Sequence, residues 1–159
     1  MVTKETENLY NDYLSQSDSR WEYGNSILYR MCKEESKHKE IDVIVGKVWL
    51  IGRSYAAAIE RRKNAVDDND DFYYDVVPSK MLEIGSELDD RITRLQESTG
   101  HIVDDVKEIL STHKFLTDTF GKMTGLKKRS LASKYLHFHC PEKFFIYDSR
   151  AIKSIGKLV

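Results

Sequence analysis

The stretch that decides the fold runs from Glu40 to Arg62 and reads EIDVIVGKVWLIGRSYAAAIERR. Its apolar residues recur at helical spacing and cover a broad face, which comprises Ile41, Ile44, Val45, Val48, Trp49, Ile51, Tyr55, Ala56 and Ile59. An apolar face of this width predicts one long helix in the middle of the domain. Glycine is costly inside a helix, so we expect Gly46 and Gly52 to allow close helix crossings.

The same periodicity continues on both sides of this stretch. Further helices are predicted near residues 9–14, 20–31, 78–95, 102–120 and 131–138, and another begins after Asp148. Residues 64–71 have the composition of an exposed acidic loop, and only Phe144 to Tyr147 is strand-like. The sequence therefore predicts a single all-α domain over residues 1–159, with about six or seven helices. Residues 1–120 would form a helical body, and residues 121–159 a basic hairpin and an aspartate-bearing helix start.

Composition excludes several classes of protein. Apolar residues make up 40% of the 159 residues and charged residues 32%, and no window holds 18 uninterrupted apolar residues. We therefore expect no membrane span. The N-terminus lacks the apolar core of a signal peptide, and the two cysteines, Cys32 and Cys140, form no disulfide framework. Reduced thiols in a cytoplasmic protein are the expectation.

Charge is distributed unevenly along the chain. Residues 122–159 carry nine Lys or Arg against two acids, a net charge of +7, whereas the remaining chain carries −8. An acidic body with a basic end favours a polyanionic partner at that end. An ordinary solvated, lysine-rich surface is the alternative.

The basic end contains a glycine loop and one prominent carboxylate. Gly125-Leu126-Lys127-Lys128-Arg129-Ser130 leads into a predicted helix, and Asp148 follows the apolar run Phe144–Tyr147. Amides of such a loop and of the helix start can face a phosphate group. Asp148 is placed either to cap the next helix or to stabilise a sugar cation beside bound DNA.

These residues resemble a known family. The pattern Gly-Leu-x-x-Arg-Ser-x-Ala-Ser-x-x-Leu, followed by Ile-Tyr-Asp-Ser-Arg-Ala, is similar to the core of the helix-hairpin-helix DNA glycosylases, and most similar to their 8-oxoguanine glycosylase branch. The resemblance covers residues 121–155. It implies that the hairpin grips the DNA backbone, that a damaged base is flipped out, and that an aspartate assists cleavage of the N-glycosidic bond.

By this resemblance Asp148 is the catalytic residue. The nucleic-acid contacts would come from Gly125, Lys127, Lys128, Arg129, Ser130, Lys134 and Arg150. The lysine that lyase members use as nucleophile should fall near Arg129 or Ser130, and neither residue can form a Schiff base. A DNA glycosylase without lyase activity is therefore expected. Lys127 also stands where a second hairpin glycine is usual, and the closeness of Asp148 to Val159 favours a minimal or truncated member.

Two other functions remain open on the sequence. The departures from the family pattern favour a non-catalytic nucleic-acid-binding protein, in bacterial defence or regulation. A helical protein-interaction module would owe the charge asymmetry to a protein partner. His137, His139 and Cys140 lack the second spaced pair typical of a zinc site, so we expect no metal and no cofactor.

Overall fold

The computed structural model describes residues 4, 7–8, 11–12, 19–62 and 72–157. Apart from isolated helical residues near the N-terminus, these residues form six α-helices and no strand, which confirms the all-α prediction. The helices are α2 (Ser19–Glu34), α3 (Ile41–Ser54), α4 (Val77–Glu97), α5 (Val106–Thr124), α6 (Arg129–His139) and α7 (Ser149–Ile155), and a short π-helix, Phe72–Val76, leads into α4. The predicted helix at residues 9–14 lies largely outside the described residues, and the predicted acidic loop at 64–71 lies wholly outside them.

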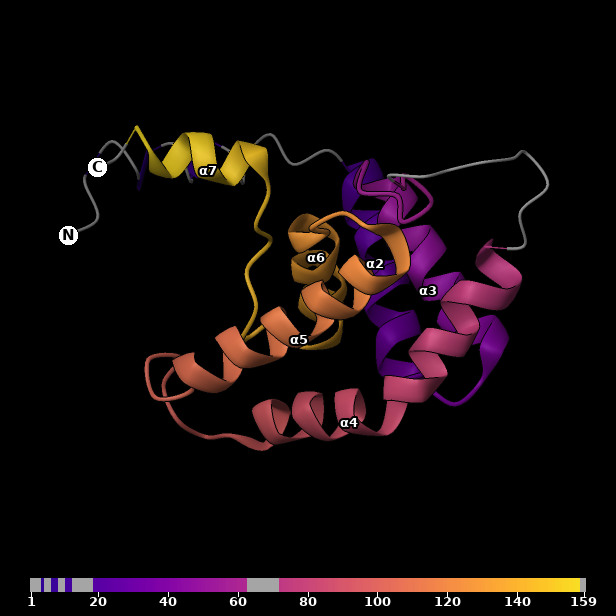
Figure 1. Ribbon diagram of the computed structural model, residues 1–159. Coiled ribbons are helices and arrows are strands. Elements are labelled where there is room, and N and C mark those ends of the chain that lie inside the picture. The colour runs from indigo at the N-terminus through magenta and orange to yellow at the C-terminus, as the bar shows by residue number, and fades with distance from the viewer. Residues whose placement is uncertain (1–3, 5–6, 9–10, 13–18, 63–71, 158–159) are drawn as a thin grey trace.

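Helix α6 occupies the middle of the molecule (Figure 1). It packs against α2, α3 and α5, and α4 lies against both α3 and α5. Eight of the eleven α6 residues are buried, including the polar residues Ser133, Lys134 and His139. A helix that is buried nearly all round must satisfy or neutralise its polar side chains within the protein.

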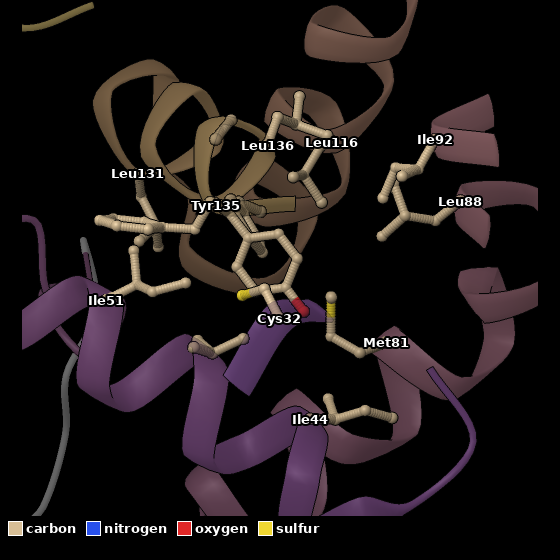
Figure 2. Packing of buried hydrophobic residues seen from close by; sticks show 14 of the residues in the cluster. Cys32, Ile44, Ile51, Met81, Leu88, Ile92, Leu116, Leu131, Tyr135 and Leu136 are labelled. Atoms are coloured by element: carbon tan, nitrogen blue, oxygen red, sulfur yellow. The ribbon is translucent and has the colours of Figure 1, made fainter. Parts of the chain in front are cut away.

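The core gathers apolar side chains from five helices around Tyr135. Figure 2 shows its ring projecting from α6 into the cluster that includes Cys32, Ile44, Met81 and Leu116. Tyr135 is fully buried, and its hydroxyl lies 2.8 Å from Nε2 of His38. The tyrosine thereby fills the core with its ring while its one polar atom keeps a hydrogen-bond partner.

The long helix expected at residues 40–62 is shorter than predicted. Helix α3 ends at Ser54, and Ala56 has a left-handed backbone with φ of 52°. The N–H of Ala57 donates to the carbonyl of Gly52 at 2.7 Å, which closes a turn. A side chain on Gly52 would meet the Cα of Ala58 at 3.3 Å, so this glycine admits the returning chain and not a second helix.

The close approach expected at Gly46 is not found among the described residues, none of which has an atom within 4 Å of the position of its missing Cβ. Such an approach occurs instead at Gly85 in α4, where a Cβ would lie 2.6 Å from the carbonyl oxygen of His38. The glycine therefore lets the segment between α2 and α3 pass directly over α4.

The chain after α6 has no regular secondary structure until α7. Phe144 is buried and Phe145 is 74% exposed, and the strand-like run Phe144–Tyr147 pairs with no strand in the described residues. Helix α7 has no buried residue and lies apart from the other helices in Figure 1.

Candidate nucleic-acid interface and carboxylate site

A tight hairpin joins α5 to α6. Helix α5 continues past Gly121 to Thr124 and is capped by Gly125, whose φ of 70° is the left-handed conformation that glycine adopts without strain. The Gly125 N–H donates to the carbonyl of Gly121 at 2.8 Å, and the Leu126 N–H donates to Oγ1 of Thr124 at 3.2 Å. The loop residues Lys127 and Lys128 then lead directly into α6.

A groove of about 640 Å³ lies beside this hairpin. It is lined by His113, Lys114, Thr117, Asp118, Gly121, Lys122, Lys127 and Arg129. Four of these residues are cationic and one is acidic, and that acid is already paired with Lys114. The hydroxyl of Thr117 is buried and has no hydrogen-bond partner in the described part of the chain. The groove is therefore a concave basic surface that holds one unused neutral donor.

The groove includes two of the predicted phosphate contacts, Lys127 and Arg129, and both are exposed. Sequence reasoning missed Thr117 and the side chains from α5. A signal was present, because His113, Thr117 and Gly121 follow at intervals of four, as do Lys114, Asp118 and Lys122. Such residues lie on one face of a helix.

Lys128, a further predicted phosphate contact, does not line the groove. Its Nζ donates to the carbonyl of Ala58 at 2.8 Å, and its side chain is half-buried. Burial lowers the pKa of this amine. Lys128 thus fastens the hairpin to the turn after α3, and its charge is engaged inside the protein.

Asp148 caps helix α7. Its Oδ1 accepts hydrogen bonds from the N–H groups of Arg150 and Ala151, each at 3.0 Å, and its Oδ2 lies 3.2 Å from Nζ of Lys134. The bond from the Ala151 amide, followed by the contact with Lys134, holds the pKa of Asp148 below its ordinary value. The carboxylate is therefore ionised at neutral pH, and its side chain is 25% exposed.

Lys134 is buried, which corrects the expectation that it contacts phosphate on the surface. Its side chain is only 2% exposed. The ammonium donates to Oγ of Ser130 at 2.7 Å and lies 5.8 Å from the ring centre of Tyr55. Buried ammonium groups need such partners, so Lys134 is held as the counter-ion of Asp148.

The hydrogen bonds connect the groove to the carboxylate. Arg129 lines the groove and accepts a contact from Nε2 of His113 at its carbonyl, at 3.1 Å. The next residue, Ser130, holds Lys134, and Lys134 holds Asp148. Both features therefore lie at the N-terminal end of α6. Arg150, a further predicted phosphate contact, lies exposed on α7 directly after this carboxylate.

Comparisons of the chain with protein-family models, curated proteins and solved structures find no significant match. Among the described residues, none of the helices combines the length and apolar character that crossing a bilayer requires. The same residues contain no cluster of three or more His, Cys, Asp or Glu side chains suited to a metal ion.

Proposed function

We propose that this protein is a DNA glycosylase that cleaves the N-glycosidic bond of a damaged or modified base. The observation that carries the proposal is the position of an ionised, partly exposed carboxylate, Asp148, at the end of α6 where the basic groove begins. DNA lying along the groove would bring a deoxyribose towards this carboxylate. Phosphate contacts of this kind position DNA without reading its sequence.

In the proposed reaction the C1′–N bond breaks and its electron pair leaves with the base, which takes a proton from solvent. The sugar is left as an oxocarbenium ion. The anionic Asp148 stabilises this cation, and water then adds to C1′ and releases its proton. An ionised carboxylate suits this electrostatic role and does not suit that of a general acid.

We propose that the enzyme has no lyase activity. A lysine does lie beside the aspartate, but its amine is enclosed and bonded to both Ser130 and Asp148. Lys134 is thereby a positioning residue for the carboxylate. Borohydride treatment during reaction with DNA should trap no covalent adduct, and an adduct lost in Lys134→Arg would contradict this assignment.

The test of the proposal is base release from duplexes that carry 8-oxoguanine, with an undamaged duplex as control. Asp148→Asn keeps a side-chain cap for α7 and removes the negative charge, so it should bind DNA normally and lose turnover. Unchanged base release in this variant would exclude the catalytic role of Asp148.

Binding is tested separately by fluorescence anisotropy at two salt concentrations. The double variant Lys127→Glu/Arg129→Glu should weaken DNA binding and lower the log–log salt slope by about two units, because each lost phosphate contact removes roughly one unit. The double variant Lys153→Glu/Lys157→Glu, on α7 and just after it, makes the matched control, since these exposed lysines lie outside the groove. Equal effects of the two changes would show that net charge alone governs binding.

A second candidate function is non-catalytic nucleic-acid binding, in defence or regulation. One observation favours it, because both oxygens of Asp148 already have partners within the protein. Salt-sensitive binding of DNA without base release, unchanged by Asp148→Asn, would establish it. A helical protein-interaction module would bind no DNA even at low salt.

A further inference from the structure

A second cavity, of about 610 Å³, lies at the opposite end of α6. It is lined by Tyr29, Cys32, Lys33, Ser36, Gln96, Phe138, His139 and Pro141, from the C-terminal parts of α2, α4 and α6 and the residues just after them. Its volume falls within the range of roughly 300–1,000 Å³ typical of small-molecule sites. None of its lining residues belongs to the basic groove or contacts Asp148.

The floor of the cavity contains an unusual histidine. His139 is 5% exposed, and neither of its ring nitrogens has a hydrogen-bond partner in the described residues. Its ring packs beside those of His38 and Tyr135, with centroids 5.1 and 5.0 Å away. Burial keeps the pKa of His139 well below its ordinary value, so the neutral ring offers one donor and one acceptor. Buried polar atoms without partners are rare and point to a group that the protein alone does not supply.

One wall is aromatic and pre-organised. Phe138 is buried, and its ring centre lies 4.8 Å from that of Tyr29. The Tyr29 hydroxyl donates to Nε2 of His137 at 2.6 Å, because Nδ1 of that histidine donates to the carbonyl of Phe144. This bond fixes the Tyr29 ring in place. Cys32 adds an apolar surface, since burial raises the pKa of its thiol to about 11 and keeps it protonated.

The rim carries the complementary polar groups. Nε2 of Gln96 donates to the carbonyl of His139 at 2.7 Å, which leaves its Oε1 as an acceptor. Lys33 and Ser36 are exposed beside it, and no described residue is hydrogen-bonded to either side chain. The cavity thus combines one aromatic wall, the Gln96 acceptor, the buried ring of His139 beneath its surface, and one cation at its mouth.

From this arrangement we propose that the cavity binds a nucleoside monophosphate, with the base packed against the aromatic wall formed by Tyr29 and Phe138 and the phosphate at Lys33. A nucleobase has the flat surface, the ring donors and acceptors and the size that this wall and His139 require. The site is independent of the basic groove and of the proposed glycosylase reaction.

The experiment is calorimetric titration of the full chain with adenosine monophosphate, adenosine and inorganic phosphate. Lys33→Glu should weaken the nucleotide at least about tenfold and leave adenosine nearly unchanged, since a charge-assisted contact contributes about that factor. Ser36→Trp should fill the mouth and abolish binding of both. Lys39→Glu, an exposed change of the same charge outside the cavity, should leave every affinity unchanged.

Three results would overturn the inference: no nucleotide binding at about 1 mM, binding of phosphate alone with the nucleotide's affinity, or binding that survives Ser36→Trp. Nucleotide bound in the basic groove would be lost in Lys127→Glu/Arg129→Glu and retained in Ser36→Trp, which also contradicts the assignment. Base release from DNA is not measured in this test. The inference about the cavity can therefore fail while the proposed glycosylase function holds, and the reverse is also possible.

Discussion

The two ends of helix α6 place ionisable groups in the same core but treat them in opposite ways. At the N-terminal end Lys134 is buried as the partner of Asp148, so charge is kept and compensated. At the C-terminal end His139 is buried without a partner, and burial keeps it uncharged. Pairing preserves a partly exposed anion, whereas neutralisation leaves an uncharged ring.

The largest effect is expected where charge is paired. Lys134→Ala removes the counter-ion of Asp148 and leaves a cavity beneath the hairpin, so the free energy of unfolding should fall by about 2–4 kcal/mol. Urea denaturation measures this change. Lys127→Ala, on the exposed side of the same hairpin, should change stability by less than about 0.5 kcal/mol. Equal losses in the two variants would show that the Lys134–Asp148 pair has no structural role.

A somewhat smaller effect is expected from a substitution in α4 that acts near the C-terminal end of α6. Gly85→Ala places a methyl group against the backbone carbonyl of His38, whose ring packs on His139. Backbone cannot rotate away as a side chain can, so the free energy of unfolding should fall by about 1–3 kcal/mol. In Gly24→Ala in α2 the new methyl group meets no atom of the described residues within 4 Å, so this change should instead stabilise the protein by roughly 0.5–1 kcal/mol. A stabilising Gly85→Ala would refute the close approach.

The smallest effect is expected in the pH dependence of the melting temperature, through His139. Burial lowers the folded-state pKa of His139, so its contribution to stability is complete above the unfolded value near 6.5 and declines as pH falls towards the folded value. The melting temperature should therefore decrease between pH 7.5 and 5.5, and His139→Phe should lessen that decrease by about 2–4 °C. His38 titrates with the same sign, because burial also lowers its pKa, so part of the decrease should persist in the variant. An unchanged pH profile would mean that His139 is not buried as a neutral ring.

Helices with a strong, uninterrupted periodicity could be predicted from the sequence. The apolar stripes of α4 and α5 and the start of α4 at Pro78 agree with the structure to within a few residues. The end of α3 could not be predicted, because Ala56, Ala57 and Ala58 favour a helix locally. Tertiary packing instead turns the chain at Gly52 and places Ala58 against it.

The sequence singles out Lys127, Arg129 and Asp148 from their positions beside a loop and a helix start. In the structure the first two line the groove, and the third contacts Lys134. Lys128 and Lys134 stand beside these residues in the sequence and carry the same charge. Sequence position alone does not show whether the ammonium group of a lysine is exposed or buried. In the structure the ammonium group of Lys128 reaches a carbonyl of another segment, and that of Lys134 reaches a carboxylate fourteen positions onward.

The sequence by itself determined the all-α class, the basic C-terminal end and the hairpin, because periodicity, net charge and glycine conformation are local properties. Only the tertiary structure decided which lysines remain exposed, which one partners Asp148, and which histidine is buried without a partner. These outcomes depend on distances between segments remote in the chain, and the free energy of a buried charge or polar group is set by those neighbours.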